Sequence, residues 1–353
     1  MAVEFHAEPD PSSEVCATVA TLSPENPFHT PAYIEARRLT GFRPWILSLR
    51  QHGEWVAACP AFSRSGHLNR SLEIPSWPSL PDGDTFVERL VEFCHRARIS
   101  CLEINSFASR RVTIPTRLPG ETGRRIRFEY LLDVRPLDWW RQLSTNHLRS
   151  IKRARKAGLQ IQRVADSQGS GKHACLVESS MERRRHRGES VSDHALTQSL
   201  LAFTQSGAGE LFQAVLRDNV VSSALILLAD RGAYLHSAGT SSEGMACGAS
   251  HYLVHEVANI MRARSMEVLN LGGADRASPG LERFKASFGA TTVSLEAAEL
   301  YLGSNVRRKL GAAVRLLRGD SLGIPGSLLG RLERYVVKRL SSGWPTRPAA
   351  RVQ

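Results

Sequence analysis

The chain has 353 residues, which is enough for two domains that each bury a core. Its hydrophobic fraction of 42% and charged fraction of 23% are those of a globular protein and exclude a disordered or collagen-like chain. Two segments supply the net charge of +12: residues 146–189 hold 11 Lys and Arg against 4 Asp and Glu, and residues 301–353 hold 11 against 2. An anionic partner is therefore expected to meet these two segments.

No stretch approaches the roughly 20 apolar residues that span a bilayer. The acidic N-terminus also lacks the apolar core of a signal peptide. Six cysteines are scattered without a Cys-x-x-Cys pair, which favours reduced thiols over a disulfide framework or a zinc site. We therefore expect a cytoplasmic protein.

Periodicity in the first half indicates alternating strands and helices. Apolar residues alternate on both sides of a turn at Gly53, as in a hairpin, and then recur at helical spacing. A helix is expected to begin near Leu137, and Gly158 marks the end of a basic helix that starts at Asn146. The predicted elements here are strands 46–49 and 55–62, helix 86–94, strands 101–107 and 126–134, and helix 146–157.

The second half repeats this order. An Arg-Ala-Arg tripeptide ends a helix just before a buried strand in both halves, at Arg96–Arg98 and at Arg262–Arg264. The matching order indicates a duplicated unit, and the mixture of strands and helices favours an α/β (α+β) class. The predicted elements here are strands 211–217, 220–229 and 233–238, helix 250–264 and strand 267–271.

The most informative segment is LNLGGADRASPGLERFKASFGA, residues 269–290. A strand ends in Gly272-Gly273, a short helix starts near Pro279 and carries Phe284-Lys285, and Gly289 ends that helix. The segment resembles the Phe-Lys-x-x-Phe-Gly signature of the Fem-type peptidyl and aminoacyl transferases and their acetyltransferase relatives in the GNAT superfamily.

The basic helix and following strand over residues 146–164 also resemble that family, as does the internal duplication, so that the resemblance covers about residues 25–300. It implies tandem GNAT-like domains over 1–135 and 136–300, each a mixed twisted sheet flanked by helices, followed by a basic helical extension over 301–353. It also implies transfer of an acyl or aminoacyl group to an amine. The donor would be acyl-CoA or aminoacyl-tRNA, with no permanently bound cofactor and no metal.

Lys285 is predicted to be catalytic. Acyl transfer builds negative charge on the carbonyl oxygen, and one well-placed donor to that oxygen is worth roughly 3 kcal/mol. Lys285 is one of only six lysines in the chain and lies in a motif with two phenylalanines. The resemblance also puts the functional lysine of the family at this position.

The donor site is expected between a strand and a helix, at Thr240–Ser250. Acetyl-CoA enzymes of the superfamily carry Arg/Gln-x-x-Gly-x-Gly/Ala there, and the backbone N–H groups hold a pyrophosphate. Here Gly248 is retained, but Met245 occupies the polar first position and Ser250 the last, where it can cap the helix. An acyl donor is therefore better supported than acetyl-CoA in particular. The residues expected to bind the donor are Gly244, Gly248, Ala249, Ser250, Gly272, Gly273 and Phe284.

Basic side chains are expected to hold an anionic substrate. Arg149, Lys152 and Lys156 belong to the basic helix, and Arg184 belongs to an ERRRHR run. In the C-terminal extension, apolar residues recur at helical spacing with basic residues around them. Helices of this kind over 303–340 suit peripheral contact with the inner face of a membrane, and packing against the domain is the alternative.

Two residues are candidates for the general base by their position: His236 on the strand before the donor loop, and Asp275 after Gly273. The run His251-x-x-x-His255-Glu256 resembles a zinc helix. Its glutamate is misplaced for a zinc protease and no third ligand is evident, so no metal is expected.

Two hypotheses follow. The first is a cytoplasmic N-acyltransferase that moves an acyl or aminoacyl group to an amine of a cell-envelope or polysaccharide precursor. The second is a non-catalytic, degenerate transferase fold that binds a membrane or nucleic acid through its basic segments in envelope assembly. In the first hypothesis, nucleic acid enters only as a tRNA donor.

Overall fold

A computed structural model of the protein describes residues 3–66, 69–80, 83–109, 114–116, 118–189, 196–274 and 278–303. The described residues, 3–303 with these gaps, belong to one compact unit. The predicted helices over 303–340, and nearly all of the predicted extension 301–353, lie outside the described residues, as does Asp275. Within the ranges given, no helix is long and apolar enough to cross a membrane.

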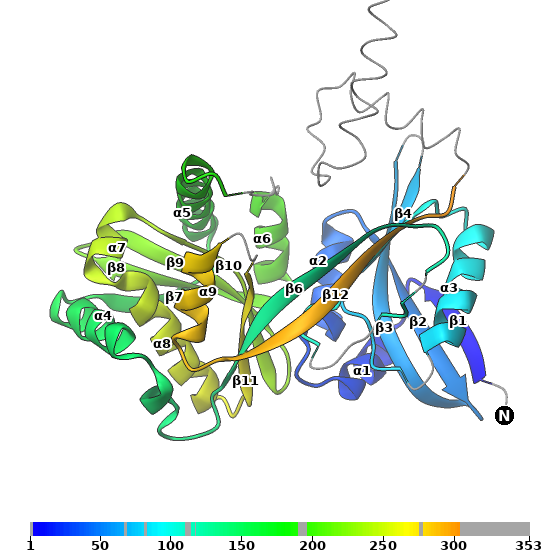
Figure 1. The fold of residues 1–353 in the computed structure, drawn as a ribbon, viewed down its shortest axis with the longest axis horizontal. Helices are drawn as coiled ribbons and strands as arrows, with labels where there is room; N and C mark the ends of the chain where they lie inside the picture. Colours follow the sequence, from blue (N-terminus) through cyan, green and yellow to red (C-terminus); the bar gives the residue numbers. More distant parts are fainter. Residues whose placement is uncertain are drawn as a thin grey trace, which may run out of the picture. The chain divides into compact units, whose positions relative to one another are not determined.

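Figure 1 labels the helices and strands, which are numbered in chain order. In the first half they are β1 (Val3–Pro9), α1 (Ser13–Leu22), the 3-10 helix η1 (Pro27–His29), α2 (Pro31–Leu39), β2 (Arg43–Gln51), β3 (Glu54–Ser65), β4 (Arg70–Ile74), α3 (Gly83–Arg96), β5 (Cys101–Ile104) and β6 (Glu121–Asp133). In the second half they are η2 (Trp139–Gln142), α4 (Thr145–Lys156), β7 (Gln160–Val164), α5 (Ser167–His186), α6 (Leu196–Gln205), β8 (Gly209–Leu216), β9 (Asn219–Leu228), β10 (Gly232–Thr240), α7 (Ser242–Cys247), α8 (Ala249–Ala263), β11 (Val268–Ala274), α9 (Pro279–Ala286) and β12 (Thr291–Tyr301).

A single mixed sheet runs through the unit in the order β1-β2-β3-β4-β5-β12-β6-β11-β10-β9-β8-β7. Counted inward from either end, it shows the same arrangement: three antiparallel pairs, one parallel pair and one antiparallel pair. A helix crosses over between the two parallel strands in each half, α3 between β4 and β5 and α8 between β10 and β11. The predicted duplication and mixed α/β class are therefore confirmed.

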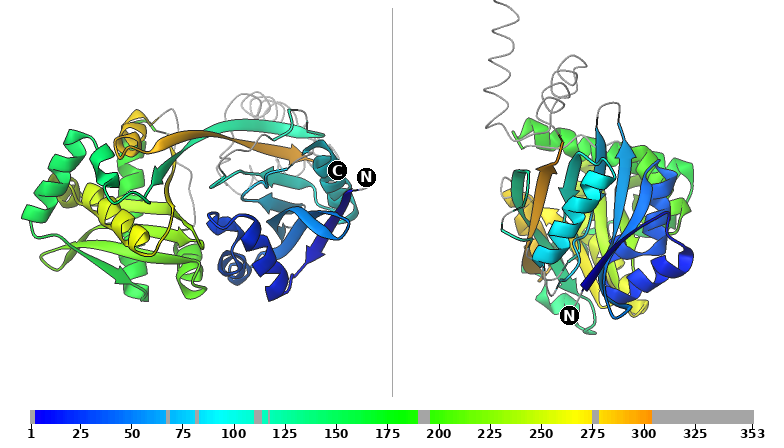
Figure 2. Two further views of the ribbon diagram at one scale, coloured as in Figure 1. Left: turned by 90° about the horizontal axis from the view of Figure 1, so that it is seen from below. Right: turned by 90° about the vertical axis from the view of Figure 1, so that its right-hand side faces the viewer.

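The two halves exchange their last strands. β6 follows β5 in the chain but pairs with β11, and β12 follows β11 but pairs with β5. β6 and β12 then run antiparallel to each other, from Thr291 opposite Leu131 to Leu300 opposite Glu121 (Figures 1 and 2). Each half-sheet is thus completed by a strand from the other half of the chain.

β10 and β11 diverge shortly after they begin. They pair in parallel only as far as Tyr234 and Asn270. Beyond that point β10 pairs with β9 up to Thr240, and β11 pairs with β6 up to Ala274, each after an irregularity in register. The facing edges of β10 and β11 therefore give each other no hydrogen bonds there, and the motif of residues 269–290 begins at this divergence.

Three clusters of buried side chains stabilise the unit. One packs α4 and α8 on the strands of the second half, around residues such as Phe212 and Leu253. Another packs α3 on the strands of the first half, around Phe86. The third takes side chains from both halves, including Tyr33 and Tyr234, and joins them through apolar contact.

Three local predictions are wrong. The helix expected near Leu137 is a single 3-10 turn, η2. The strand expected to end at Gly272-Gly273 continues to Ala274, because after an irregularity at Gly272 the chain pairs with β6 again through Gly273 and Ala274. The stretch Thr240–Ser250 is not an open loop: it contains α7, which Ser241 caps by accepting the N–H of the residue three positions on.

Gly239 lies where α5 crosses β10, and a Cβ there would lie 2.2 Å from the carbonyl carbon of Leu176 and 2.3 Å from the nitrogen of Val177. We expect Gly239→Ala to lower the free energy of unfolding by more than about 2 kcal/mol, because backbone rather than a flexible side chain must move. The matched control is Gly171→Ala within α5, where a Cβ meets nothing within 4 Å. That change should stabilise the helix by up to about 1 kcal/mol. Urea unfolding measures both, and equal stabilities would contradict the packing described.

Candidate active site

The Phe-Lys-x-x-Phe-Gly segment forms α9 and the turn that ends it. The rings of Phe284 and Phe288 pack against His147 of α4, with centroid separations of 5.4 and 4.5 Å. Gly289 has a φ of +78°, and a Cβ there would collide with the segment before α4. With its two phenylalanines held in this way, α9 directs Lys285 toward β11.

The amine of Lys285 is inside the protein. The residue is only 6% exposed, and Nζ donates a hydrogen bond to the carbonyl oxygen of Gly273 at 2.5 Å. Loss of hydration on burial lowers the pKa of Lys285 from 10.5 to about 7. The charge of Glu129 opposes this change, whereas the charges of Arg127 and Arg184 add to it. The ammonium and the neutral amine are therefore both accessible near pH 7.

Glu129 of β6 is fully buried beside this lysine, and both of its carboxylate oxygens accept hydrogen bonds. Oε1 accepts from the hydroxyl of Tyr234 at 2.8 Å. Oε2 accepts from the side-chain amide of Asn270 at 2.8 Å and from the backbone N–H of Ala108 at 3.0 Å. The guanidinium of Arg127 lies 3.3 Å from Oε1. These donors satisfy a carboxylate that would otherwise be costly to bury.

The two glycines at the end of β11 leave room for this cluster. Gly272 has a φ of +73°, and a Cβ on it would lie 2.8 Å from the carbonyl oxygen of Leu235 in β10, with Nζ of Lys285 at 3.6 Å and the hydroxyl of Tyr234 at 3.7 Å. A Cβ on Gly273 would lie 2.4 Å from the guanidinium of Arg127. The structure therefore brings the predicted residues Gly272, Gly273 and Lys285 together at one point.

The sequence did not predict the four side chains that surround Lys285 and these two glycines: Arg127, Glu129, Tyr234 and Asn270. One signal was present, because Glu129 is a lone acid between Phe128 and an apolar run in a predicted strand, and acids are rarely buried without partners. Two partners of Glu129, Tyr234 on β10 and Asn270 on β11, come more than a hundred residues later in the chain. Only the strand exchange brings them together.

The predicted donor residues Gly248, Ala249 and Ser250 lie where α7 meets α8. Gly248, at a φ of +84°, ends α7 and is also the N-cap of α8. Ala249 and Ser250 occupy the first turn of α8, so the prediction that Ser250 caps this helix is wrong.

Close packing accounts for the glycines of this segment. A Cβ on Gly244 would lie 2.3 Å from the carbonyl oxygen of Val221 in β9. A Cβ on Gly248 would lie 2.7 Å from the carbonyl oxygen of Ser150 in α4. The predicted donor segment is therefore fixed to the sheet on one side and to the basic helix on the other.

Phe284 links the lysine motif to the first turn of α8. Its ring lies 5.0 Å from the ring of His251, and its carbonyl oxygen lies 3.0 Å from Nε2 of His147. Burial lowers the pKa of His251 to about 4, helped by the charges of His147 and Arg153, and burial also lowers the pKa of His147. Both rings are neutral near pH 7. Among the residues that the structure describes, no three His, Cys, Asp or Glu side chains are grouped to hold a metal ion.

The predicted substrate residues of α4 face solvent. Arg149, Lys152 and Lys156 are exposed and form no ion pair with the described part of the chain. Arg155 on the same helix pairs instead with Glu256 of α8 at 3.1 Å. With Arg153, which is also exposed, α4 presents four cations that form no ion pair with the described residues, next to the predicted donor segment.

Arg184 has a different position from the other predicted substrate residues. Its guanidinium donates to Glu189 at 2.8 Å and to the hydroxyl of Ser278 at 3.0 Å. Hydrogen bonds that Glu189 accepts from Arg184 and from the hydroxyl of Ser278, the latter at 2.7 Å, hold the pKa of Glu189 at about 2. Arg184 thereby connects the end of α5 to the start of α9, and its charge acts on Lys285.

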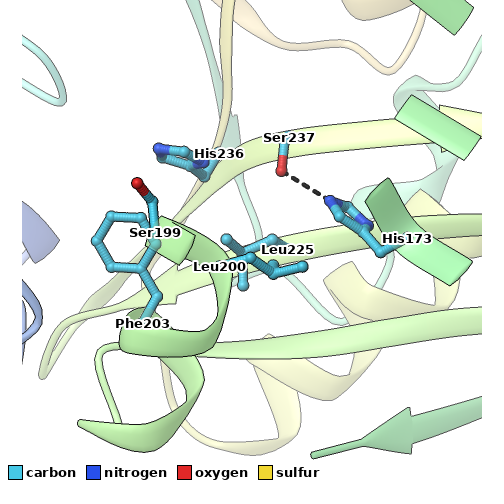
Figure 3. A pocket seen from close by; sticks show the side chains of 7 residues that line it. All are labelled: His173, Ser199, Leu200, Phe203, Leu225, His236 and Ser237. Carbon is cyan, nitrogen blue, oxygen red and sulfur yellow. Dashed lines mark hydrogen bonds between the residues drawn. The ribbon is translucent and has the colours of Figure 1, made fainter. Parts of the chain in front are cut away.

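His236 lines a small pocket between α5, α6 and the strands β9 and β10 (Figure 3). Its ring lies 5.1 Å from the ring of Phe203. His173 of α5 also lines this pocket, with its two ring nitrogens 2.9 Å from the hydroxyls of Ser223 and Ser237. Whether His236 acts as the general base stays a prediction.

Replacing Lys285 with methionine should change how stability depends on pH. Lowering the pKa from 10.5 to about 7 corresponds to about 5 kcal/mol against folding when the lysine is charged. Above pH 7 the unfolded chain retains a proton that the folded chain has released, so the wild type gains stability as pH rises. Lys285→Met removes this dependence. The amount by which its free energy of unfolding exceeds that of the wild type should therefore fall by about 3 kcal/mol between pH 6 and pH 9.

Urea unfolding at a series of pH values measures this difference. Lys172→Met serves as the control, because that lysine is exposed on α5 and its charge stays in water when the chain folds. A constant difference between Lys285→Met and the wild type across this range would show that the lysine amine is hydrated.

Comparison with known proteins agrees with this geometry. Residues 141–286 match the model of the acetyltransferase (GNAT) domain family. The crystal structure of FemX has a TM-score of 0.63 at 13% identity, over 84% of this chain and 97% of that one. A tandem GNAT protein from the clavulanic acid biosynthesis pathway has a TM-score of 0.53 at 10% identity, over 86% and 100%.

The C-terminal domain of a putative lysylphosphatidylglycerol synthetase from Agrobacterium fabrum has a TM-score of 0.50 at 15% identity, over 86% and 98%. No curated protein matches the sequence significantly. At such identities the solved structures show the fold alone. The chain therefore has a tandem GNAT-type fold, and its residues 141–286 match the acetyltransferase (GNAT) domain model.

Proposed function

We propose that the protein transfers an acyl or aminoacyl group from an activated donor to an amine, with Lys285 stabilising the charge that develops on the donor carbonyl. The buried Lys285 amine, beside the divergence of β10 and β11, carries this proposal. Among the described residues, Nζ donates to one acceptor, the carbonyl oxygen of Gly273. An ammonium group has three hydrogens to donate, so it can donate to a substrate oxygen as well.

In the proposed reaction, the acceptor amine attacks the donor carbonyl carbon and the bond to the donor's leaving group breaks. Negative charge collects on the carbonyl oxygen before that bond breaks, and the Lys285 ammonium stabilises it where water is largely excluded. The amine loses one proton to a general base. His236 and Asp275 remain the candidates for that base.

The divergence of β10 and β11 supports binding of an extended donor. Beyond Tyr234 and Asn270 no ladder joins β10 and β11. On β11 the N–H of Gly272 already donates to the Asn270 side chain and the carbonyl oxygen of Gly273 accepts from Lys285, so an extended donor would add main-chain hydrogen bonds along the edge of β10. A donor bound in this way would present its carbonyl close to Lys285, with Gly272 and Gly273 allowing close approach.

The exposed cations of α4 support an anionic substrate. Arg149, Lys152 and Lys156 lie on the helix that contacts Gly248, so a long anionic molecule can meet the helix and the donor segment together. Acyl-CoA and aminoacyl-tRNA both fit this description. We propose that the acceptor is an amine of a cell-envelope or polysaccharide precursor at the cytoplasmic side of the membrane, and the fold shared with FemX supports this choice.

One observation favours a second candidate function. The donor segment contains α7 in place of an open glycine-rich loop, and Met245 there is 47% exposed. A degenerate transferase that only binds membranes or nucleic acid in envelope assembly would tolerate this change.

Thermal shift against a donor panel separates the two functions. A ligand that binds only the folded state stabilises it by about 2.7 kcal/mol at 100 times its Kd. We expect acyl-CoA or aminoacyl-tRNA to raise the Tm, with a further rise when a nucleotide-linked muropeptide is added. Stabilisation by uncharged tRNA or anionic vesicles alone would support the second function instead.

Lys285→Ala should lower kcat by about a hundredfold or more, because it removes a donor to the developing oxyanion. The fold should persist, since the truncation removes a buried charge. Lys172→Ala, on the exposed surface of α5, is the matched control and should turn over like the wild type. Steady-state kinetics and circular dichroism give both readouts. Unchanged turnover in the Lys285→Ala enzyme would refute this role.

A further inference from the structure

Arg127 of β6 lies beside the lysine site but has no part in the reaction as described so far. Its guanidinium stacks over the ring of Phe107, with the central carbon Cζ 4.1 Å from the ring centroid. The side chain is 29% exposed, and its Nε atom is buried without a hydrogen-bond partner among the described residues. A guanidinium that is held on an aromatic ring and keeps donors free is suited to bind a carboxylate or a phosphate.

The ion pair with Glu129 does not by itself account for this arginine. The carboxylate oxygens of Glu129 already accept three hydrogen bonds, at 2.8 to 3.0 Å, from Tyr234, Asn270 and the backbone of Ala108. The guanidinium lies farther away, 3.3 Å from Oε1. The buried carboxylate would therefore keep its hydrogen bonds without Arg127.

Positive charge exceeds negative charge around Lys285. Among the described groups that act most on this lysine, Glu129 is the one carboxylate, whereas Arg127 and Arg184 are both cationic. Glu189 compensates the charge of Arg184, from which it accepts a hydrogen bond at 2.8 Å. Arg127 and the Lys285 ammonium then share one buried carboxylate, and an anionic group on a substrate would balance the second cation.

The strand that carries Arg127 lies on the far side of β11 from the proposed donor edge. β11 is between β6 and β10 in the sheet, and the donor is proposed to bind along β10. A Cβ on Gly273 of β11 would lie 2.4 Å from the Arg127 guanidinium, and the carbonyl oxygen of Gly273 accepts from Lys285. Arg127 therefore reaches the lysine site from the side that the donor leaves to the acceptor.

We propose that Arg127 binds an oxyanionic group, a carboxylate or a phosphate, that the acceptor carries next to its reacting amine. The inference rests on the proposed transfer reaction, because that reaction makes the bound amine the acceptor. Two N–H groups of the guanidinium can donate to two oxygens of the anion, which directs the amine toward the donor carbonyl. Arg127 is thus a specificity-determining residue, since an acceptor with a neutral amide in place of the anion leaves the guanidinium without a partner.

Two matched pairs of small amines test this without turnover: glycine against glycinamide, and phosphoethanolamine against ethanolamine. The chain has only six lysines, so the full-length protein labelled with carbon-13 at the lysine ε position gives few signals, and Lys285→Met assigns that of Lys285. At pH 7 and constant ionic strength, the anionic member of at least one pair should shift the Lys285 signal saturably. Its neutral counterpart should bind about tenfold more weakly or worse. The pair that shows the preference identifies the anion as a carboxylate or a phosphate.

Arg127→Gln should abolish the preference for the anionic probe. Arg127→Lys should reduce it, because the charge beside Glu129 is kept but the two-pronged donor is lost. Arg125→Gln is the matched control, since Arg125 lies on the same strand, is 51% exposed and pairs with Glu299 at 3.0 Å. That variant should keep the wild-type preference, and circular dichroism checks the fold of all three.

The inference is overturned if neither pair shows a preference for its anionic member. It is also overturned if both Arg127 variants keep the preference, or if Arg125→Gln loses it to the same extent. Arg127-dependent binding in a protein that turns over no donor would refute the proposed transfer alone. Conversely, equal turnover of acceptors with and without the anion would leave the transfer intact and rule out this role of Arg127.

Discussion

Burying the Lys285 amine is the constraint on which the rest of the site depends. An ammonium removed from water is costly unless nearby charge and hydrogen bonds compensate. Here the Gly273 carbonyl accepts from it, and the charge of Glu129 opposes the desolvation. Glu129 needs its own donors, and these come from β10, β11 and the backbone after β5. Only a cluster of side chains from both halves of the chain thus keeps the pKa of Lys285 from falling further.

The strand exchange explains why both halves are needed. β6 belongs to the first half by sequence, yet it carries Glu129 into the sheet of the second half beside β11. The two parallel pairs also differ. β4 and β5 pair through Ile74, and a bridge between Ser76 and Ser106 then continues the contact. Among the described residues, no bridge joins β10 and β11 beyond Tyr234 and Asn270. The lysine site lies at this end of the second half's parallel pair, and β6 of the first half contributes Arg127 and Glu129 to it.

The sequence predicted the parts of the molecule whose signals are local. Helical spacing identified α3, α4 and α8, and the lysine motif identified α9 and its glycines. The N-terminal elements β1, α1 and α2, the helices α5 and α6, and β12 were not assigned. α5 lacks a clear apolar stripe because its inner face packs through Gly169, Ser170 and His173.

The Glu129 cluster was also beyond prediction, because its members become neighbours only through long-range strand register. Likewise, α7 was not expected because short helices depend on packing more than on propensity.

Mass spectrometry of amine-bearing envelope precursors tests the central claim most directly. Cells that make the wild-type protein should contain a precursor heavier by the fixed mass of one acyl or aminoacyl group. That species should be absent from cells without the protein and from cells in which Lys285→Ala replaces it. Identical precursor masses in all three would contradict the account, and a species that persists with Lys285→Ala would show that transfer does not depend on the buried amine.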